Sequence, residues 1–425
     1  MMIYVISKSG KPLMPCSPVI ARLLLKSGRA GVKRREPFTI RLHCETTEYV
    51  QPLTLGVDTG SGTFATAVSD NKTNIVYISE VTVRNDITDK MKQRLRYRRI
   101  RRNRKTRYRQ ARFDNRRNSI KTGRFSPTMA SKTNSHIKEI EYVKGILPIT
   151  VTVLETGQFD PHLMKNPTLS NPDVRHWGYQ KGPNYGYENT RAMVIDRDNH
   201  TCQLCKGRHR DSNLEVHHIV FKSNGGSDDA DNLITLCHTC HKALHKGVIT
   251  PNLNGKKKDT LKHATQMNSI RKQLLIRCPD AIETFGYVTK ANRLALNISK
   301  EHYHDACVIA TQGKSFTIKN SLFRKRCIPA GDFQKTKGIR SEQSINTGKI
   351  SGFRKFDKVL YMGNEYFIKG RMSSGYAILM DINGKKADFS HMPKGYKTPK
   401  MSNMKRIQAR STWMITREEV TQNIA

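Results

Sequence analysis

The sequence predicts a multidomain α/β protein, and three observations lead to that prediction. The chain has 425 residues, which is more than a single hydrophobic core usually serves. Buried-looking strands at 53–58 and 149–155 stand far apart and are followed by helical segments, which favours a sheet covered by helices. A segment rich in cysteine and histidine at 202–245 interrupts this pattern and indicates a separate insert.

The charge of the chain predicts a polyanionic partner. There are 75 Lys and Arg against 35 Asp and Glu, which gives a formal net charge of +40. Such an excess repels itself in a compact fold unless a polyanion neutralises it, so nucleic acid is the first expectation and an anionic membrane surface the alternative. No apolar run approaches the roughly 18 residues that a membrane-spanning helix needs, and no signal peptide is evident. We therefore expect a soluble, unsecreted protein without a membrane partner.

Two strand units are expected in the first 160 residues. After about 50 residues of short apolar stretches, a strand ends at Asp58 and a glycine turn. Two alternating strands then flank the turn at 70–74, as in a hairpin. A further strand alternates from Ile149 and ends at Glu155, so both units deliver a carboxylate at a strand end.

A long basic helix is expected between these units. From Lys90 to Asn118 we count fifteen Lys or Arg against one acid, Asp114, with no Pro or Gly. Like charges at i,i+4 destabilise an isolated helix by a few tenths of a kcal/mol each, so this helix should form fully only along an anion. The arginines expected to bind nucleic acid are Arg94, Arg96, Arg98, Arg99, Arg101, Arg102, Arg104, Arg107 and Arg109.

Four of the nine cysteines predict a metal site. Cys202 and Cys205 form one Cys-x-x-Cys pair, and Cys237 and Cys240 form a second one after a 31-residue interval. Two such pairs indicate a reducing compartment with a metal site rather than a disulfide framework. Four thiolates match a structural Zn²⁺, and reduced bystander cysteines are the alternative.

Histidines inside this segment predict a second metal site. His241 and His245 are four residues apart at the start of a helix and so share one face. If His217 points toward them from a hairpin, the three form an open divalent-metal site, and the adjacent His218 points to the opposite side of its strand. His218 would then deprotonate a water that attacks a phosphodiester, and the amide of Asn232 could brace the histidine loop.

Residues 195–250 resemble an HNH nuclease module of the ββα-metal type with a zinc clasp. The resemblance implies that His218 is the general base and that His217 and His241 hold Mg²⁺ or Mn²⁺, with His245 as a third ligand. A zinc knob that only binds nucleic acid is the alternative, but it would not need the additional histidines. Besides the cysteine pairs, the matching residues are His217, His218, Gly225, Gly226, Asn232, His241 and His245.

A second set of candidate residues consists of carboxylates. Asp58 and Glu155 end predicted strands, and His302 and Asp305 are three apart on one face of a predicted helix with Ser299 as its N-cap. Mg²⁺ prefers carboxylate oxygens from several elements, which lets two ions about 4 Å apart clamp the attacking and leaving oxygens. This order is the pattern of an RNase H-like nuclease. Taken alone, each acid is more often a turn residue.

The order of all these features resembles the IscB family of RNA-guided nucleases, relatives of the CRISPR effector nucleases whose RuvC domain is split around an HNH insert. The likeness extends over essentially the whole chain and includes GKPLMP at 10–15, the motif that names the first domain of the family. It implies a RuvC centre of Asp58, Glu155, His302 and Asp305, in which the three carboxylates bind Mg²⁺ or Mn²⁺.

The resemblance also implies an order of segments. A bridge helix would hold guide RNA, and a C-terminal domain, whose turns and short strands suggest a small barrel, would contact the guide scaffold and the target-adjacent motif. The partners would be structured guide RNA and double-stranded target DNA, bound by a monomer in a ribonucleoprotein of the prokaryotic cytoplasm. The expected segments are a PLMP domain at 1–52, RuvC part I at 53–85, the arginine-rich bridge helix at 86–124, RuvC part II at 125–170, the HNH domain at 171–262, RuvC part III at 263–322 and the C-terminal domain at 323–425.

Three functions compete at this point. The first is an RNA-guided DNA endonuclease whose HNH site cuts the guide-paired strand and whose RuvC site cuts the displaced strand. Only about 35 residues separate the basic helix from Glu155, so the RNA itself would have to supply the architecture around a heteroduplex. The second is a guide-free HNH endonuclease of restriction or homing type, and the third is a non-catalytic, zinc-bearing RNA-binding scaffold.

Overall fold

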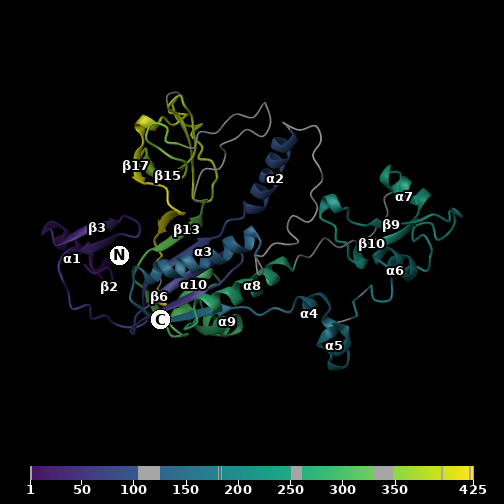
Figure 1. The fold of residues 1–425 in the computed structure, drawn as a ribbon, viewed down its shortest axis with the longest axis horizontal. Coiled ribbons are helices and arrows are strands. Elements are labelled where there is room, and N and C mark those ends of the chain that lie inside the picture. The colour runs from purple at the N-terminus through teal and green to yellow at the C-terminus, as the bar shows by residue number, and fades with distance from the viewer. Residues whose placement is uncertain are drawn as a thin grey trace. The chain divides into compact units, whose positions relative to one another are not determined.

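The computed structural model describes residues 2–103, 125–179, 181–182, 184–249, 261–329, 348–393, 396–420 and 423–424. The chain is a mixed α/β protein with two compact units (Figure 1). The larger unit comprises Met1–Gln158 and Gln266–Ala425, and the smaller unit comprises Phe159–Thr265. Among the described residues, no helix combines the length and the apolar character that crossing a bilayer requires.

The larger unit begins with a small sheet and one helix. The described strands have the order β2-β1-β4-β3, in which β1 and β4 are parallel. Ser17 caps the helix by accepting a hydrogen bond from the Ile20 amide, and Pro18 occupies its first turn, where no amide hydrogen is needed. The elements are β1 (Ile3–Ile6), β2 (Pro12–Cys16), α1 (Pro18–Lys26), β3 (Ala30–Arg34) and β4 (Thr39–Leu42).

A sheet of nine described strands forms the centre of the larger unit. Its main path is β11-β8-β5-β6-β7-β12-β19, and β13 pairs with both β7 and β18. Strands β11, β8 and β5 are parallel, and β5, β6 and β7 form antiparallel pairs, as expected for the hairpin after Asp58. The strands are β5 (Leu53–Asp58), β6 (Thr63–Ser69), β7 (Asn74–Thr82), β8 (Ile149–Thr156), β11 (Ile282–Phe285), β12 (Phe316–Ile318), β13 (Leu322–Cys327), β18 (Trp413–Glu418) and β19 (Asn423–Ile424).

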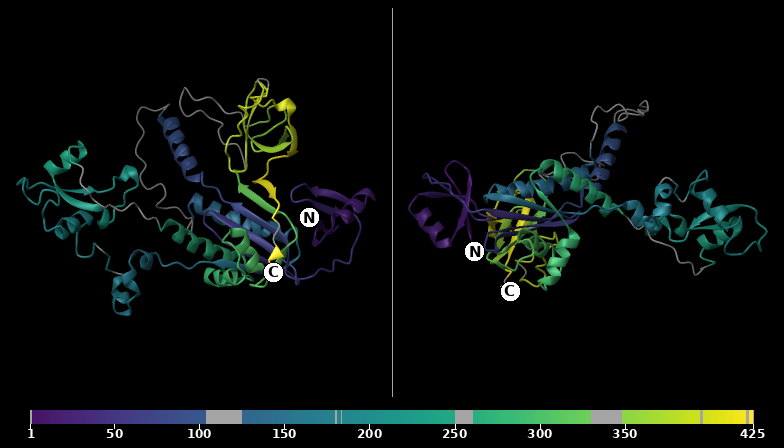
Figure 2. Two further views of the ribbon diagram at one scale, coloured as in Figure 1. Left: turned by 180° about the vertical axis from the view of Figure 1, so that it is seen from behind. Right: turned by 90° about the horizontal axis from the view of Figure 1, so that it is seen from below.

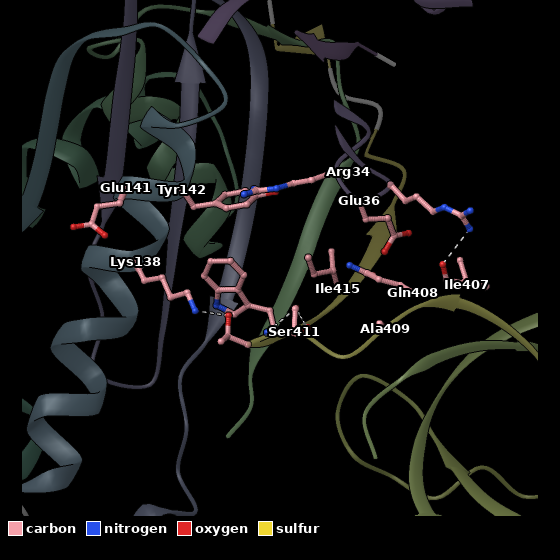
Figure 3. A pocket seen from close by; sticks show the side chains of 13 residues that line it. Arg34, Glu36, Lys138, Glu141, Tyr142, Ile407, Gln408, Ala409, Ser411 and Ile415 are labelled. Carbon is pink, nitrogen blue, oxygen red and sulfur yellow. Dashed lines mark hydrogen bonds between the residues drawn. The ribbon is translucent and has the colours of Figure 1, made fainter. Parts of the chain in front are cut away.

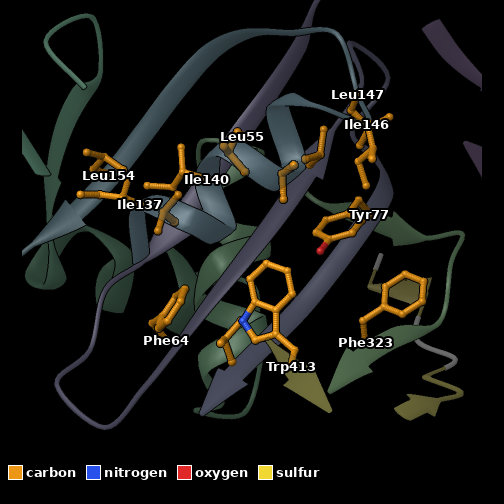
Figure 4. Close-up of a cluster of buried hydrophobic side chains, with 14 of the residues drawn as sticks. Leu55, Phe64, Tyr77, Ile137, Ile140, Ile146, Leu147, Leu154, Phe323 and Trp413 are labelled. Atoms are coloured by element: carbon orange, nitrogen blue, oxygen red, sulfur yellow. The ribbon is translucent and has the colours of Figure 1, made fainter. Parts of the chain in front are cut away.

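Helices cover both faces of this sheet (Figure 2). On one face, α3 (Pro127–Lys144) and α8 (Lys262–Arg277) bury Ile140 and Ile270 against strand residues such as Leu55. Figure 4 shows this core, in which Tyr77 and Trp413 fill the space beneath α3. On the other face, α10 (His302–Ala310) packs its alanines against β6, and α9 (Gly286–Ala295) precedes it.

One ion pair lies inside the core beneath α3. Lys325 Nζ is 2.6 Å from Glu139 Oε1, and both side chains are completely buried. Tyr77 donates a hydrogen bond to the same carboxylate oxygen, and the Lys325 ammonium lies 5.0 Å from the centre of the Trp413 ring. The charges are therefore paired and hydrogen-bonded, which is the condition for burying them.

A close approach of backbones fixes α10 against strand β5. A Cβ atom at Gly56 would lie 2.4 Å from the amide nitrogen of Ala310 and 2.6 Å from the carbonyl oxygen of Ala306, so only glycine fits there. The prediction of Ser299 as the N-cap of this helix is wrong. The helix begins at His302, and the Ser299 hydroxyl lies instead 3.2 Å from Nδ1 of His304.

Helix α2 (Ile87–Asn103) is the described part of the predicted basic helix. Arg94, Arg96 and Arg99 are exposed along it, and Arg98 is half-buried. Residues 104–124 lie outside the described part of the chain, and with them the predicted nucleic-acid ligands Arg104, Arg107 and Arg109.

The C-terminal part of the larger unit contains an antiparallel sheet with the order β16-β15-β14-β17. The prediction of a small barrel is wrong for the described strands, because β16 and β17 are the two edges of an open sheet. Strands β13 and β18 belong to the nine-stranded sheet, which therefore extends past the expected segment boundary at residue 323. The elements are β14 (Lys358–Tyr361), β15 (Asn364–Arg371), β16 (Ala377–Met380), η4 (Met401–Asn403) and β17 (Lys405–Gln408).

The smaller unit is built around the hairpin β9–β10. His218 pairs with Leu233 and His217 with Ile234 in an antiparallel register. Helix α6 begins after Asn189, whose side chain accepts a hydrogen bond from the Ala192 amide. The elements are α4 (Pro161–Lys165), η1 (Pro167–Ser170), α5 (Pro172–Gly178), α6 (Thr190–Arg197), β9 (Leu214–His218), η2 (Lys222–Asn224), η3 (Ala230–Asn232), β10 (Leu233–Cys237) and α7 (His238–His245).

Candidate metal centres and active sites

The four cysteines of the two Cys-x-x-Cys pairs meet in the smaller unit. The sulfur atoms of Cys202, Cys205, Cys237 and Cys240 all lie within 4.8 Å of one another. Those of Cys205 and Cys237 are 3.8 Å apart, which is about the separation of two sulfurs that bind one tetrahedral Zn²⁺ at roughly 2.3 Å. The donor set therefore suits a structural zinc ion. His209, which sequence reasoning missed, places Nδ1 3.4 Å from Cys240 Sγ and can donate a hydrogen bond to a thiolate.

His217, His241 and His245 form a second cluster in the same unit. Their nearest ring nitrogens lie within 4.8 Å of one another, and Nε2 of His241 is 3.2 Å from Nε2 of His245. Burial, reinforced by the neighbouring histidines, lowers the pKa of His217 to about 4. The imidazole of His217 therefore favours the neutral form, which is the form that binds metal ions.

Glu215 holds the orientation of this cluster. It lies two residues before His217 on the same face of β9, and its Oε2 is 2.5 Å from Nδ1 of His241. Its Oε1 accepts a hydrogen bond from Nδ1 of His238 at 2.9 Å, and this bond is the main cause of a lowered pKa of Glu215. A proton held on Nδ1 of His241 leaves Nε2 free for a metal ion. Alternation along the strand was the signal that could have revealed Glu215 in the sequence.

His218 lies on the other side of the strand, as the sequence predicted. Its Nε2 is 2.8 Å from Oδ1 of Asp228, and Lys222 Nζ is 2.8 Å from the same oxygen. An open groove of about 510 Å³ is lined by His218 and Asp228 and also by His241. The groove therefore brings the predicted base and a predicted metal ligand to one space, and Asp228 is a further residue that sequence reasoning missed.

Asn232 braces the loop that follows His218. The side chain is fully buried, donates to the carbonyl oxygens of Val220 and Ser227 and accepts from the Val220 amide. A Cβ atom at Gly226 would lie 1.7 Å from the Val220 carbonyl oxygen, so only glycine fits at this position of the loop. This is the bracing role that the sequence predicted for the amide.

The predicted carboxylates converge in the larger unit. Asp58 and Glu155 are register neighbours on the parallel strands β5 and β8. His302, in the first turn of α10, donates from Nδ1 to Oδ2 of Asp58 at 2.6 Å. Asp305 follows one turn later, and its Oδ1 is 2.9 Å from Nε of Arg293 without the alignment of a hydrogen bond. Arg293 was missed by sequence reasoning, and nothing in its local pattern indicates this contact.

The electrostatics of this cluster favour a bound cation. Burial and the charge of Asp58 raise the pKa of Glu155 to about 7. Burial also raises the pKa values of Asp58 and Asp305, against the opposing effects of His302 and Arg293. Oε2 of Glu155 and Oδ1 of Asp305 are buried without a hydrogen-bond partner. Buried carboxylate oxygens of this kind are the ligands that Mg²⁺ prefers.

The carboxylate cluster differs from the cysteine and histidine clusters in how far apart its candidate ligand atoms lie. In the described part of the chain, the groups of three or more candidate ligands within 4.8 Å are the four cysteines and the three histidines. The oxygens of Asp58, Glu155 and Asp305 are spread more widely.

Comparison with known protein families gives matches to two stretches of the chain. Residues 3–182 match the family model described as RRXRR protein, and residues 202–247 match the model described as HNH endonuclease. The chain is IscB-like. The HNH match contains both the cysteine and the histidine clusters, so the chain carries an HNH endonuclease domain.

Two curated relatives match short stretches of the IscB-like chain. The type IV methyl-directed restriction enzyme EcoKMcrA of Escherichia coli (strain K12) is 37% identical over 62 residues, which is 13% of this chain and 22% of the enzyme. Anaredoxin of Nostoc sp. (strain PCC 7120 / SAG 25.82 / UTEX 2576) is 35% identical over 68 residues, which is 16% of this chain and 86% of anaredoxin. Over those 68 residues the chain belongs to one family with anaredoxin. The chain spans less than a quarter of the restriction enzyme.

Solved structures with some similarity include two Cas9 proteins. The Streptococcus thermophilus Cas9 in complex with the AGAA PAM is 11% identical, with a TM-score of 0.33 over 57% of this chain and 32% of that one. The Type II-C Cas9 enzyme from Actinomyces naeslundii is 14% identical, with a TM-score of 0.15 over 44% of this chain and 26% of that one.

Proposed function

We propose that this protein is an RNA-guided DNA endonuclease with two separate cutting sites. The observation that carries the proposal is the convergence of Asp58, Glu155, His302 and Asp305 from distant parts of a chain that also holds an HNH endonuclease domain. A guide-free HNH enzyme has no use for this second cluster. A non-catalytic scaffold has no use for either cluster, and least of all for the buried Oε2 of Glu155, which has no hydrogen-bond partner.

In the HNH site, His218 acts as the general base. Its hydrogen bond to Asp228 orients the ring and leaves the other ring nitrogen able to take a proton from the attacking water. Glu215 keeps His241 in one tautomer, and Asn232 holds the loop beside the base. A Mg²⁺ or Mn²⁺ held by His217, His241 and His245 would stabilise the charge on the leaving oxygen.

In the second site, the nine-stranded sheet serves as an RNase H-like, RuvC-type core. Asp58, Glu155 and Asp305 would hold Mg²⁺ or Mn²⁺, and the hydrogen bond from His302 keeps Asp58 in place. Bound cations would favour the ionised form of Glu155, whose pKa is raised to about 7 in their absence. Gly56 is a positioning residue here, because it allows α10 to carry Asp305 close to the strand ends.

The partners are structured guide RNA and double-stranded target DNA, bound by one copy of the chain. The net charge of +40 and the exposed arginines of α2 support a polyanion along this helix. The proposed segments are the PLMP domain at 1–52, the RuvC parts at 53–85, 125–170 and 263–322, the bridge helix at 86–124, the HNH domain at 171–262 and the RNA- and DNA-contacting segment at 323–425.

Strand-specific cleavage tests the proposal. With guide RNA bound, Asp58→Ala should leave only a nick in the guide-paired strand, and His218→Ala should leave only a nick in the displaced strand. The matched controls are Asp280→Asn and His200→Ala, which change exposed residues of the larger and smaller units. Unchanged double-strand cutting by Asp58→Ala would contradict the role of the carboxylate cluster.

A second candidate function is a guide-free endonuclease that reads DNA directly. The stretch shared with the methyl-directed restriction enzyme favours it. Sequencing of the RNA that co-purifies with the protein separates the two functions. A discrete transcript that is required for cutting supports the guided enzyme, whereas specific cutting by RNA-free protein supports the guide-free one.

A further inference from the structure

An open cleft of about 680 Å³ lies in the larger unit, and Figure 3 shows the side chains that line it. Its walls come from β3, from α3 and from the segment that joins β17 to β18. The volume is within the range of pockets that hold small organic ligands. None of the residues that line this cleft belongs to the sites described above.

Aromatic rings and cations alternate in the wall of the cleft. The Arg34 guanidinium lies 4.7 Å from the centre of the Tyr142 ring, and Lys138 Nζ lies 4.8 Å from the centre of the Trp413 ring. The two aromatic rings meet edge to face, with their centres 5.3 Å apart. The buried Lys325 ammonium lies 5.0 Å from the centre of the Trp413 ring and 4.3 Å from the centre of the Tyr142 ring, so both rings are fixed parts of the wall. Such a surface suits a planar, aromatic ligand with a negative charge.

The charge of the lining supports an anionic ligand. Arg34, Arg35 and Lys138 contribute three cations, and Glu36 and Glu141 contribute two acids. Oε1 of Glu36 is 2.8 Å from the buried ammonium of Lys358, which lies equally close to Oε2 of Glu365, so the charge of Glu36 is partly compensated. Cations are therefore in excess at the cleft.

Glu36 also provides a hydrogen-bond acceptor. Its second oxygen, Oε2, is buried and has no hydrogen-bond partner. A buried acceptor without a partner destabilises the protein unless a ligand or water donates to it. An N–H group on the edge of a nucleobase is such a donor, and a purely apolar ligand is not.

We propose that this cleft binds a single unpaired nucleotide of RNA, with its base against Tyr142 and Trp413 and its phosphate at Arg34 and Lys138. A base N–H group donates to Oε2 of Glu36. The proposal rests on the proposed function, in which RNA is the partner. It adds a site where the protein contacts one unpaired base rather than duplex backbone, and unpaired bases are the usual targets of sequence-dependent RNA recognition.

Tryptophan fluorescence of the full chain tests this site. The chain has two tryptophans, and Trp177→Phe removes the one outside the cleft, so that emission reports Trp413 alone. The probes are a short unstructured RNA and free AMP. We expect RNA to quench the emission, because stacking on an aromatic wall brings the base against the ring.

Substitutions of cleft residues test whether the quenching arises from RNA bound in the cleft. In the Trp177→Phe background, Tyr142→Leu should weaken RNA binding by roughly 5- to 150-fold, the range expected for loss of one base–aromatic stack. Lys138→Gln should weaken it in the same direction. Lys144→Gln is the matched control, because it removes the same charge from an exposed position of the same helix. Lys138 is only half-buried, so its variant remains informative if Tyr142→Leu does not fold.

The two probes distinguish the sources of the nucleotide. Quenching by AMP as well as by RNA supports a site for which one nucleotide suffices, and quenching by RNA alone supports a site that needs the polymer. Quenching by AMP without any response to RNA would overturn the proposal in favour of a free-nucleotide pocket. An unresponsive Trp413, or equal effects of Lys138→Gln and Lys144→Gln, would overturn it too. If any of these results overturned the cleft proposal while guide RNA still co-purified with the protein, the proposed function would remain intact.

Discussion

The histidine cluster and the carboxylate cluster reach their geometry by different routes. The histidines come from one hairpin and the helix that follows it, and four cysteines clasp the same segment. The carboxylates come from two strands and a helix that are separated by up to 247 positions, from Asp58 to Asp305. The first cluster therefore depends on local structure, whereas the second depends on the fold of the whole larger unit.

The two clusters also differ in how the protein prepares them for a cation. Burial keeps His217 neutral by lowering its pKa to about 4, so a metal ion can bind without displacing a proton. Burial and neighbouring charge raise the pKa of Glu155 to about 7, so this carboxylate has to lose a proton near neutral pH before a cation binds. At neutral pH His217 is thus already in the form that binds a metal ion, whereas Glu155 is only partly ionised.

Loss of the zinc clasp should have the largest effect and should be confined to the smaller unit. Structural zinc contributes about 10–16 kcal/mol of binding free energy in zinc-finger peptides, most of which is folding free energy. Cys240→Ser should remove bound zinc and abolish hydrogen-exchange protection in β9 and β10, while β5 and β8 keep theirs. Elemental analysis and exchange mass spectrometry measure both. Cys16→Ser, at a half-buried cysteine of the N-terminal sheet, is the control, and zinc retained at full stoichiometry in Cys240→Ser would contradict the clasp.

A single methyl group at Gly56 should damage the carboxylate cluster alone. The added Cβ of Gly56→Ala meets the backbone of α10 at 2.4 Å, and overpacking of this kind costs about 1–3 kcal/mol. We expect lower stability of the larger unit and weaker cutting of the displaced strand, with the other nick unchanged. Gly62→Ala is the matched control, because a Cβ there meets no atom within 4 Å. Equal effects of the two variants would contradict the importance of the close approach.

Loss of the Glu215 carboxylate should weaken metal binding at the histidine cluster. Groups that orient a metal-binding histidine typically contribute 10- to 100-fold in affinity. We expect Glu215→Gln to weaken Mn²⁺ binding by that factor in zinc-loaded protein, measured by calorimetry in the Asp58→Asn background, in which the carboxylate cluster is disabled. Glu188→Gln changes an exposed acid of the same unit and should have no effect. Unchanged affinity in Glu215→Gln would mean that the contact with His241 does not prepare the site.

Mild acid should destabilise the packing around His136, which supports the carboxylate cluster. His136 is fully buried, stacks on Phe64 and accepts a hydrogen bond from the Gly60 amide, and its burial lowers its pKa to about 4. Between pH 6.5 and 4 the unfolded chain binds more protons at this residue, so stability falls as the pH falls. From pH 6.5 to 5 the loss is about 2 kcal/mol. Urea unfolding followed by Trp413 fluorescence measures it, and His136→Gln should show a correspondingly flatter profile.

Sequence reasoning named most of the side chains that the structure brings together, because the signals were short and chemical. The cysteine spacing, the adjacent pair His217 and His218 and the strand-end Asp58 are readable without any fold. It missed Glu215, Asp228 and Arg293, because a charged residue near a site is common and only its contacts distinguish it. It placed the N-cap of α10 wrongly at Ser299, because several polar residues precede the helix and the hydroxyl bonds to His304 instead.

By itself the sequence determined which chemistry is available: thiolates and imidazoles at fixed short spacings, carboxylates at the ends of strands, and a large positive charge. Those are local properties, since strand alternation and helical periodicity decide which face a residue occupies. Only the tertiary structure decided that Asp58, Glu155 and Asp305 share one neighbourhood, because strand register and the contact of α10 with Gly56 are long-range packing events. The tertiary structure also decided the cleft between Arg34 and Trp413. Its wall is formed by segments that lie nearly 400 residues apart in the sequence, and no local pattern predicts that they meet.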